Sequence, residues 1–263
     1  MENKYSLKGV LIALAKCILF FALYLLMQIV SVALITLALG LSSPEKLEYL
    51  TQMSVELNII AGCITILIFA LLAKLFKTSL SEMAHFNKMP PRFILSMIVM
   101  GVATSYIVAM ALTGLELLDL IPDSWVQVQN DTYEDVVSAS PLLQGLFVGI
   151  IAPLLEEILF RGCMLGTLKK EMHPWIAICI SALFFGLAHG TPLGIIYATV
   201  LGLIMGWLMV RFNSILPSIL FHVAYNLTVS FGGGLTIFTM ILPIPILILE
   251  IVDIIKYFRG KQL

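Results

Sequence analysis

Residues 10–39 read VLIALAKCILFFALYLLMQIVSVALITLAL, a run of about 30 residues in which Lys16 is the only charge. A helix needs about 20 predominantly apolar residues to cross the hydrocarbon core of a bilayer. The apolar region of a cleavable signal peptide is much shorter, at about 7–15 residues. We therefore expect this run to be an uncleaved first membrane span, although Lys4 and Lys8 precede it as they would precede a signal sequence.

The whole chain has the same character as this run. Of its 263 residues, 60% are hydrophobic and 12% are charged. Soluble domains carry about 25% charged residues, and a globule of this length could not bury so much apolar surface. The net charge of −1 gives no general attraction to an acidic or basic partner. The composition excludes a soluble enzyme and a nucleic-acid reader, and predicts an all-α polytopic membrane protein whose surface contacts membrane lipid.

About eight apolar segments are long enough to be spans, and the fifth is the shortest of them. They are Val10–Leu39, Leu57–Phe76, Phe93–Leu115, Pro141–Leu165, Trp175–His189, Leu193–Val210, Ser214–Phe231 and Leu235–Ile255. With the N-terminus in the cytoplasm, this order places all 15 Lys and Arg residues except Lys46 on the inner side. Acids dominate the outer loops, among them Glu45 and Glu48. Because Lys and Arg concentrate in cytoplasmic loops, we expect a multi-pass protein of the cell membrane with both termini cytoplasmic.

One polar connection, Ile121–Ser140, divides the chain. We expect it to be an outer loop with a short interfacial helix anchored by Trp125. On this basis residues 1–140 form an N-terminal part with three spans and the loop. Residues 141–232 form a core of four spans that holds nearly all the intramembrane polar residues. Residues 233–263 form the last span, interrupted by prolines, and a cytoplasmic tail.

Glycines recur at four-residue spacing in this core, at Gly186, Gly190 and Gly194 and again at Gly202 and Gly206. Small residues at this spacing let helix backbones approach closely in lipid. We therefore expect the later helices to be tightly packed.

Two adjacent carboxylates interrupt the fourth span. Glu157 and Arg161 are four residues apart, so they share a helix face and can form an ion pair. Glu156 points about 100° away and has no partner on its own helix, so it must face another part of the bundle. Charged groups inside a membrane are costly and are usually functional or paired.

Two further polar pairs lie in later spans. Phe185 precedes His189 by four residues, and His222 precedes Asn226 by the same interval. Glu156 and His189 are about equally far from the turn at residues 172–173, which places them level across a hairpin at 1.5 Å per residue. The same count puts His222 at a similar depth. His85 and His173 lie in connections and are expected to be solvated.

In this order the three motifs, Glu-Glu-x-x-x-Arg, Phe-x-x-x-His and His-x-x-x-Asn, resemble those of the CPBP family, over roughly residues 140–231. That family contains the type II CAAX prenyl endopeptidases and bacterial Abi proteins linked to bacteriocin self-immunity. The resemblance implies an intramembrane endopeptidase with a cavity open to the cytoplasm. It implies that Glu156 and His189 activate water, that His222 and Asn226 stabilise the oxyanion, and that Glu157, Arg161 and Phe185 support the site.

The resemblance leaves the mechanism open, because the family is often labelled metalloprotease while a metal-free, glutamate-based reaction has also been argued for it. A catalytic zinc needs three protein ligands and an open position. His189 and His222 with Glu156 or Glu157 could supply them. The chain has no His-Glu-x-x-His motif, and an Asn beside His222 suits an oxyanion donor better than a ligand. We favour general-base catalysis without a cofactor, with zinc as the alternative.

Other functions fit part of the pattern. Intramembrane Glu and His residues also mark ion and proton paths, although coupled transporters often show repeats and paired broken helices, and we find no repeat here. A non-catalytic immunity or scaffold protein could retain the fold. The substrate of a protease could be a prenylated CAAX protein, a peptide precursor or another membrane-anchored protein.

Overall fold

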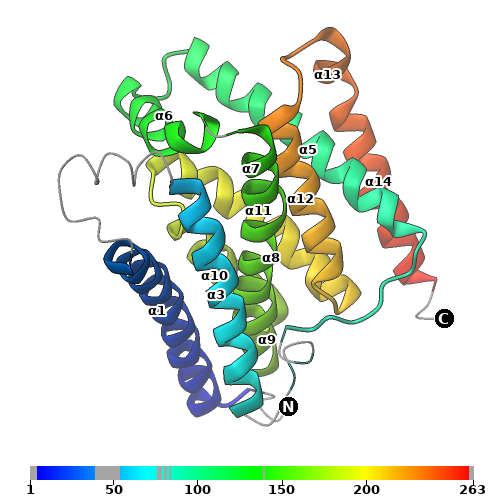
Figure 1. Ribbon diagram of the computed structural model, residues 1–263. Coiled ribbons are helices and arrows are strands. Elements are labelled where there is room, and N and C mark those ends of the chain that lie inside the picture. Colours follow the sequence, from blue (N-terminus) through cyan, green and yellow to red (C-terminus); the bar gives the residue numbers. More distant parts are fainter. Residues whose placement is uncertain are drawn as a thin grey trace.

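The computed structural model describes residues 5–38, 54–75, 79, 82, 84–138 and 140–260, and the part it describes contains helices and no strand. The predicted all-α membrane bundle is confirmed (Figure 1). Several residues used to orient the chain lie outside the described ranges: Lys4, Glu45, Lys46, Glu48, Lys77 and Lys261.

The first seven predicted spans fall on helices over their described residues. The first three are α1 (Leu7–Ala38), α3 (Ser54–Leu75) and α5 (Phe93–Leu117). The fourth is one unbroken rod made of α7 (Pro141–Leu146), η1 (Phe147–Ile151), α8 (Ala152–Glu156), η2 (Glu157–Leu165) and α9 (Gly166–Glu171). The next three are α10 (Pro174–Leu187), α11 (Pro192–Phe212) and α12 (Leu216–Phe231). Within the described residues, four helices are long and apolar enough to cross a membrane, and three shorter apolar helices accompany them.

The predicted last span differs from the rest. It is divided into α13 (Ile237–Ile241) and α14 (Pro243–Arg259), as expected from its prolines. Pro243 opens α14, where the missing N–H of proline costs no helix hydrogen bond. The helix carries four charged residues, Glu250, Asp253, Lys256 and Arg259, and is not among the helices apolar enough to span. Membrane crossing by this segment therefore remains a prediction.

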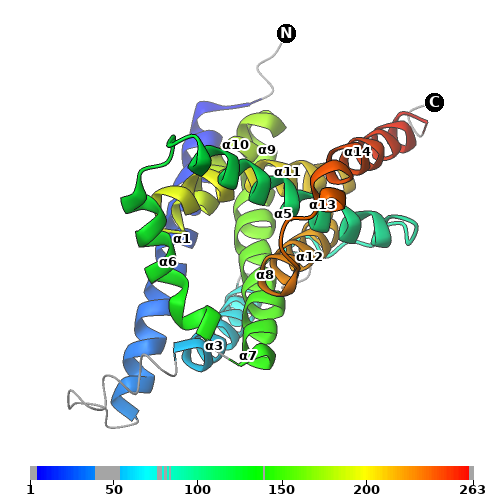
Figure 2. The same cartoon turned by 90° about the horizontal axis from the view of Figure 1, so that it is seen from above.

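The connection after α5 contains a helix, as predicted. This helix, α6 (Asp123–Ser138), begins just before Trp125, whose side chain is exposed. In Figure 1, α6 lies at one end of the bundle, whereas the start of α1 and the end of α14 lie in the opposite half. Figure 2 shows α1 and α14 on opposite sides of the bundle when it is seen from above.

Small residues set the spacing of the central helices. Gly202 of α11 packs against Ala182 of α10, and Gly206 packs against Ile178. Gly186 faces Thr199 in the same interface, so the tight packing expected of these glycines is confirmed for three positions. Gly190 has another role: its φ of +71° forms the turn between α10 and α11, a conformation in which glycine carries no steric penalty.

Capping residues set the boundaries of the central rod and of α11. The hydroxyl of Ser140 accepts a hydrogen bond from Leu143 N, and Pro141 takes the first position of α7. The hydroxyl of Thr191 accepts from Gly194 N at the start of α11. Such caps satisfy N–H groups that the first helical turn leaves free.

The connection before α5 contradicts one expectation. His173 is exposed, as predicted, but His85 is half-buried and its ring lies against Gly166 of α9. Beside it, the amide of Asn87 donates to the carbonyl of Asn213 at 2.6 Å, and Lys169 Nζ donates to Asn213 Oδ1 at 2.8 Å. This burial was not predictable from the local sequence, because Gly166 provides the space for the ring from a distant part of the chain.

Candidate functional site

The central rod departs from α-helical geometry on both sides of Glu156. Residues Phe147–Ile151 and Glu157–Leu165 are π-helical, and Glu156 is the last residue of the short α-helix between them. A π-helix bonds residue i to i+5 and occurs frequently at functional sites. The hydroxyl of Ser181 on α10 donates to the carbonyl of Phe160 at 2.7 Å and so gives one π-helical carbonyl a partner from outside the rod.

Glu157 and Arg161 form the expected ion pair within this π-helix. Arg161 Nη1 lies 3.0 Å from Glu157 Oε1, and both side chains are 0% exposed. The guanidinium also lies over the ring of Phe185, with its carbon 4.1 Å from the ring centroid. A buried cation near a ring face is stabilised by the ring's quadrupole. In the described residues, the guanidinium nitrogens have no aligned hydrogen-bond partner. The ion pair with Glu157 and the contact with the Phe185 ring are therefore the principal interactions that offset the cost of burying the Arg161 charge.

His222 lies between the two carboxylates. Its Nδ1 is 3.0 Å from Glu157 Oε1, and its Nε2 is 3.6 Å from Glu156 Oε2. Because an ionised carboxylate can only accept, the contact with Glu157 implies a proton on Nδ1. The expectation that Glu156 meets a partner across the bundle agrees with this contact. The partner is His222 on α12.

His189 occupies a neighbouring position. It follows the end of α10 and lies in the turn before α11, two residues beyond the helix on which we expected it. Its Nδ1 is 2.9 Å from the carbonyl oxygen of Phe185, and its ring packs edge-on against Phe185 at 4.8 Å between centroids. Phe185 also contacts the ring of His222, so it separates the two imidazoles. No hydrogen bond or ion pair joins His189 to Glu156, both of which the structure describes.

Asn226 joins α12 to the first π-helical segment. Its Nδ2 donates to the carbonyl of Val148 at 3.0 Å. A carboxamide nitrogen carries two N–H groups, so the second remains for another acceptor. The predicted role of Asn226 as an oxyanion donor stays a prediction.

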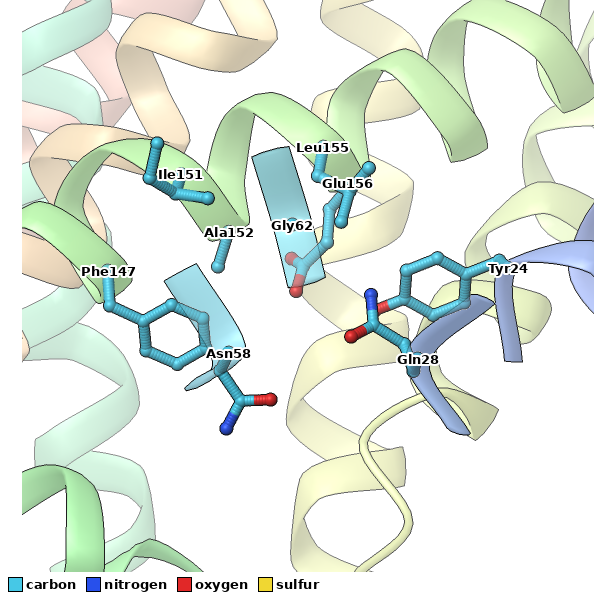
Figure 3. A pocket seen from close by; sticks show the side chains of 9 residues that line it. All are labelled: Tyr24, Gln28, Asn58, Gly62, Phe147, Ile151, Ala152, Leu155 and Glu156. Atoms are coloured by element: carbon cyan, nitrogen blue, oxygen red, sulfur yellow. The ribbon is translucent and has the colours of Figure 1, made fainter. Parts of the chain in front are cut away.

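Glu156 also borders a cavity of about 220 Å³. Figure 3 shows its carboxylate pointing into this space from the central rod. The wall is built by three separate parts of the chain: Tyr24 and Gln28 of α1, Asn58 and Gly62 of α3, and Phe147, Ile151, Ala152 and Leu155 of the rod. The Glu156 side chain is 18% exposed. It is therefore partly accessible, unlike the fully buried Glu157 beside it.

Sequence reasoning missed the residues that α1, α3 and α6 contribute around the site. Gln129 of α6 bonds through its amide oxygen to the hydroxyl of Thr191, and its Nε2 lies 3.3 Å from the hydroxyl of Tyr197. The Tyr197 ring in turn packs edge-on against His189. The sequence signals for these residues were isolated amides: Gln28 and Asn58 in apolar runs, and Gln129 in a polar loop.

The residues proposed as zinc ligands do not form one cluster. In the part of the chain described here, no group of three His, Cys, Asp or Glu side chains is arranged to hold a metal ion. Both nitrogens of His222 face carboxylates, and Nδ1 of His189 faces a backbone carbonyl. This arrangement does not fit a zinc site without rearrangement, so we derive the chemistry from the side chains alone.

Comparison with known proteins supports the resemblance seen in the motifs. Residues 138–228 match the family described as type II CAAX prenyl endopeptidase Rce1-like. This segment contains the central rod with both carboxylates, His189, His222 and Asn226. The predicted resemblance is confirmed for this part of the chain, within the region expected to be the core.

Curated relatives cover different lengths. The chain is 28% identical to the UPF0177 protein YxdF of Lactococcus lactis over 54% of this chain and 75% of that protein. It is 32% identical to the putative membrane peptidase YdiL of Bacillus subtilis over 35% of this chain and 37% of that protein. It is 37% identical to human CAAX prenyl protease 2 over 29% of this chain and 20% of that protein. The two named peptidases are thus matched over well under two thirds of their lengths. No solved structure matches the chain.

Proposed function

We propose that this chain, whose residues 138–228 match the CAAX prenyl endopeptidase family, is an intramembrane endopeptidase. The observation that carries the proposal is Glu156. Its carboxylate is partly accessible, borders a cavity and faces an imidazole that a second carboxylate holds in place. A carboxylate near an imidazole at the edge of a cavity is the arrangement that general-base catalysis needs.

In the proposed reaction, Glu156 takes a proton from a water molecule while the water oxygen attacks the carbonyl carbon of a peptide bond. The proton then passes to the leaving amine as the C–N bond breaks, so no further reactant is consumed. His222 Nε2 faces the same carboxylate and is positioned by Glu157. As the resemblance implied, His189 is assigned to the attacking water, and His222 with Asn226 to the developing oxyanion.

Glu157, Arg161 and Phe185 act by holding His222 in place. Arg161 balances the charge of Glu157, and the ring of Phe185 packs against the guanidinium and both imidazoles. Such buried support keeps catalytic groups within small tolerances of their working geometry.

The proposed substrate is a peptide or a membrane-anchored protein. CAAX-type processing, peptide maturation and bacteriocin immunity are all consistent with this chemistry.

We further propose that the protein lies in the cell membrane with both termini cytoplasmic, which reporter fusions at Asp131 and after residue 263 would test. A reporter signal from the outer side at the C-terminus would contradict that topology.

The deciding experiment replaces the base. The peptides of membranes from a deletion strain are compared after complementation with the wild type, with Glu156→Gln or with Glu116→Gln. Glu116 is exposed at the end of α5 and serves as the matched control. We expect cleavage products with the wild type and the control, and none with Glu156→Gln at equal protein abundance. Full cleavage by Glu156→Gln would overturn the proposal. An absence of cleavage products with the wild type itself would also overturn it. In that case, loss of ion flux in Glu156→Gln would indicate a transporter, and an unchanged phenotype would indicate a scaffold.

A further inference from the structure

We infer that Gln28 of α1 binds the backbone of the substrate peptide in the cavity beside Glu156. This inference rests on the proposed peptidase function and extends it to a helix outside the segment matched by the family. It assigns a substrate-binding role to residues that carry none of the three motifs.

The position of Gln28 is unusual for its helix. Leu25 and Ile29, its neighbours on α1, are exposed apolar side chains suited to lipid. Gln28 instead lines the cavity, and Figure 3 shows its carboxamide directed into the same space as the carboxylate of Glu156. Among the described residues it makes no hydrogen bond. Its side chain is half-buried, so the amide stays accessible from the cavity and can pair with a polar group of a bound molecule.

The chemistry of the cavity favours a peptide backbone. A carboxamide both donates and accepts, so Gln28 can pair with a peptide C=O, a peptide N–H or both. On the side of the cavity formed by the central rod, Phe147, Ile151 and Leu155 provide an apolar wall that a side chain of the substrate can contact. Among the described residues that line the cavity, Glu156 is the only charged one. It would repel the phosphate of a lipid headgroup, whereas a backbone amide is neutral.

The size of the cavity limits what it can hold. Its volume of about 220 Å³ is below the range of about 300–1,000 Å³ that is common for drug-sized ligands. It therefore fits a short piece of peptide. A lipid group attached to the substrate would extend beyond it.

Binding can be measured without catalysis. The probe is a peptide that the wild-type protein cleaves in the membrane comparison above, synthesised with a fluorescent label. Its affinity is measured for full-length Glu156→Gln protein and for the same protein carrying Gln28→Leu. Loss of one buried hydrogen bond costs about 1–3 kcal/mol, so we expect Gln28→Leu to weaken binding by about 5- to 150-fold. In the active enzyme, KM should rise while kcat changes little, as expected when uniform binding is lost.

Gln127→Leu on α6 is the matched control, because it makes the same chemical change at an exposed position outside the cavity. It should bind the probe like the parent protein. Gln28→Met provides a second variant that keeps the length of the side chain, and thermal unfolding in detergent confirms that each variant folds.

A backbone-modified probe shows whether Gln28 contacts the peptide itself. Backbone N–H groups of the probe are methylated one at a time. If the amide oxygen of Gln28 accepts a hydrogen bond from one of these N–H groups, methylation of that group weakens binding to the parent protein. The same methylation causes no further loss of affinity in Gln28→Leu. Depsipeptide probes, in which an ester replaces one amide, test the case in which Gln28 donates to a carbonyl of the peptide. Their affinities are compared between the parent protein and Gln28→Leu in the same way. The inference would be overturned if Gln28→Leu and Gln28→Met bound the probe as tightly as Gln127→Leu does. It would also be overturned if every modified probe lost the same affinity for the parent protein and for Gln28→Leu. If the wild type cleaves no peptide, or if Glu156→Gln cleaves fully, it is the proposed function that fails.

Discussion

His222 Nδ1 lies 3.0 Å from Glu157 Oε1, and this contact joins α12 to the π-helical part of the central rod. Glu157 also faces Arg161, so one buried carboxylate organises both an imidazole and a guanidinium. With Nδ1 committed to Glu157, the opposite ring nitrogen faces Glu156 at 3.6 Å. The hydrogen bond made by one imidazole nitrogen sets the state of the other, so Glu157 controls the group that faces the proposed base.

The first prediction concerns this contact. Glu157→Gln and His222→Asn should be energetically coupled, because each removes one side of the same buried interaction. Residues in direct contact show coupling energies of about 0.5–3 kcal/mol. The measurement is a double-mutant cycle of unfolding free energies in detergent. His222→Asn combined with Asp253→Asn provides the additive control, because Asp253 of α14 forms an exposed ion pair with Arg92, just before α5. Additivity of both pairs would show that the contact contributes nothing to stability.

The second prediction compares two ion pairs of different burial. Removing one partner of a buried pair costs about 3–5 kcal/mol, so Arg161→Ala should lower the unfolding free energy by about that amount. Arg92 pairs with Asp253 at 2.7 Å, but the two side chains are 52% and 51% exposed. Exposed pairs are worth about 0–1 kcal/mol, so Arg92→Ala should change stability little. Equal effects of the two variants would contradict the buried state of Arg161.

Several features of the fold were predictable because they depend on local sequence. Apolar runs predicted where the helices lie, since an apolar surface is stable in lipid only on a segment long enough to cross it. The spacing of Glu157 and Arg161 predicted their ion pair, because residues four apart share a helix face. Proline predicted the interruption before α14. Each of these depends on residues close together in the chain.

The contacts between helices were less predictable. Counting residues from a turn estimates depth but gives no direction around the helix axis. It placed Glu156 level with His189, whereas the side chain that Glu156 contacts is His222. The π-helical segments on both sides of Glu156 change which way later residues point. Gln28 is recognisable in the sequence as a lone amide in an apolar run. Its place in the cavity beside Glu156, on which the proposed substrate contact rests, depends on how α1 packs beside the rod.

The third prediction concerns acid stability. Burial, with the positive charges of Lys169 and Lys170 adding to it, lowers the pKa of His85 from 6.5 to about 4. Between these values the unfolded chain binds a proton that the folded protein excludes. Stability therefore falls as the pH drops from about 6.5 toward 4, and above 6.5 this penalty is absent.

His85→Asn tests this effect, because Asn tolerates the positive φ of 55° at this position and does not titrate. Thermal unfolding midpoints measured from pH 7.5 to pH 4 should fall less steeply for the variant than for the wild type. His173→Asn, at an exposed histidine, is the control and should follow the wild type. Parallel curves for all three proteins would show that His85 does not contribute to acid sensitivity.

The fourth prediction concerns metal. The proposed reaction uses the side chains of the chain alone, because His189, His222 and Glu156 do not form a set of zinc ligands here. Purified active protein should contain zinc well below one ion per chain, and its activity should survive a chelator. Activity that disappears with the chelator and returns with zinc, in protein with stoichiometric zinc, would establish the metal-dependent alternative.

The fifth prediction concerns Asn226. One N–H of its amide donates to the carbonyl of Val148, which fixes the side chain and leaves the other for the oxyanion. Loss of one oxyanion donor typically lowers kcat by about 10²–10³-fold. We therefore expect Asn226→Ala to reduce kcat by this order with little change in KM. Thr228→Ala is the control on the same helix, because within the described part of the chain that hydroxyl bonds to the carbonyl of Ala224 alone. A raised KM at unchanged kcat would instead make Asn226 a substrate-binding residue, because a donor that acts only in the transition state leaves ground-state binding unaltered.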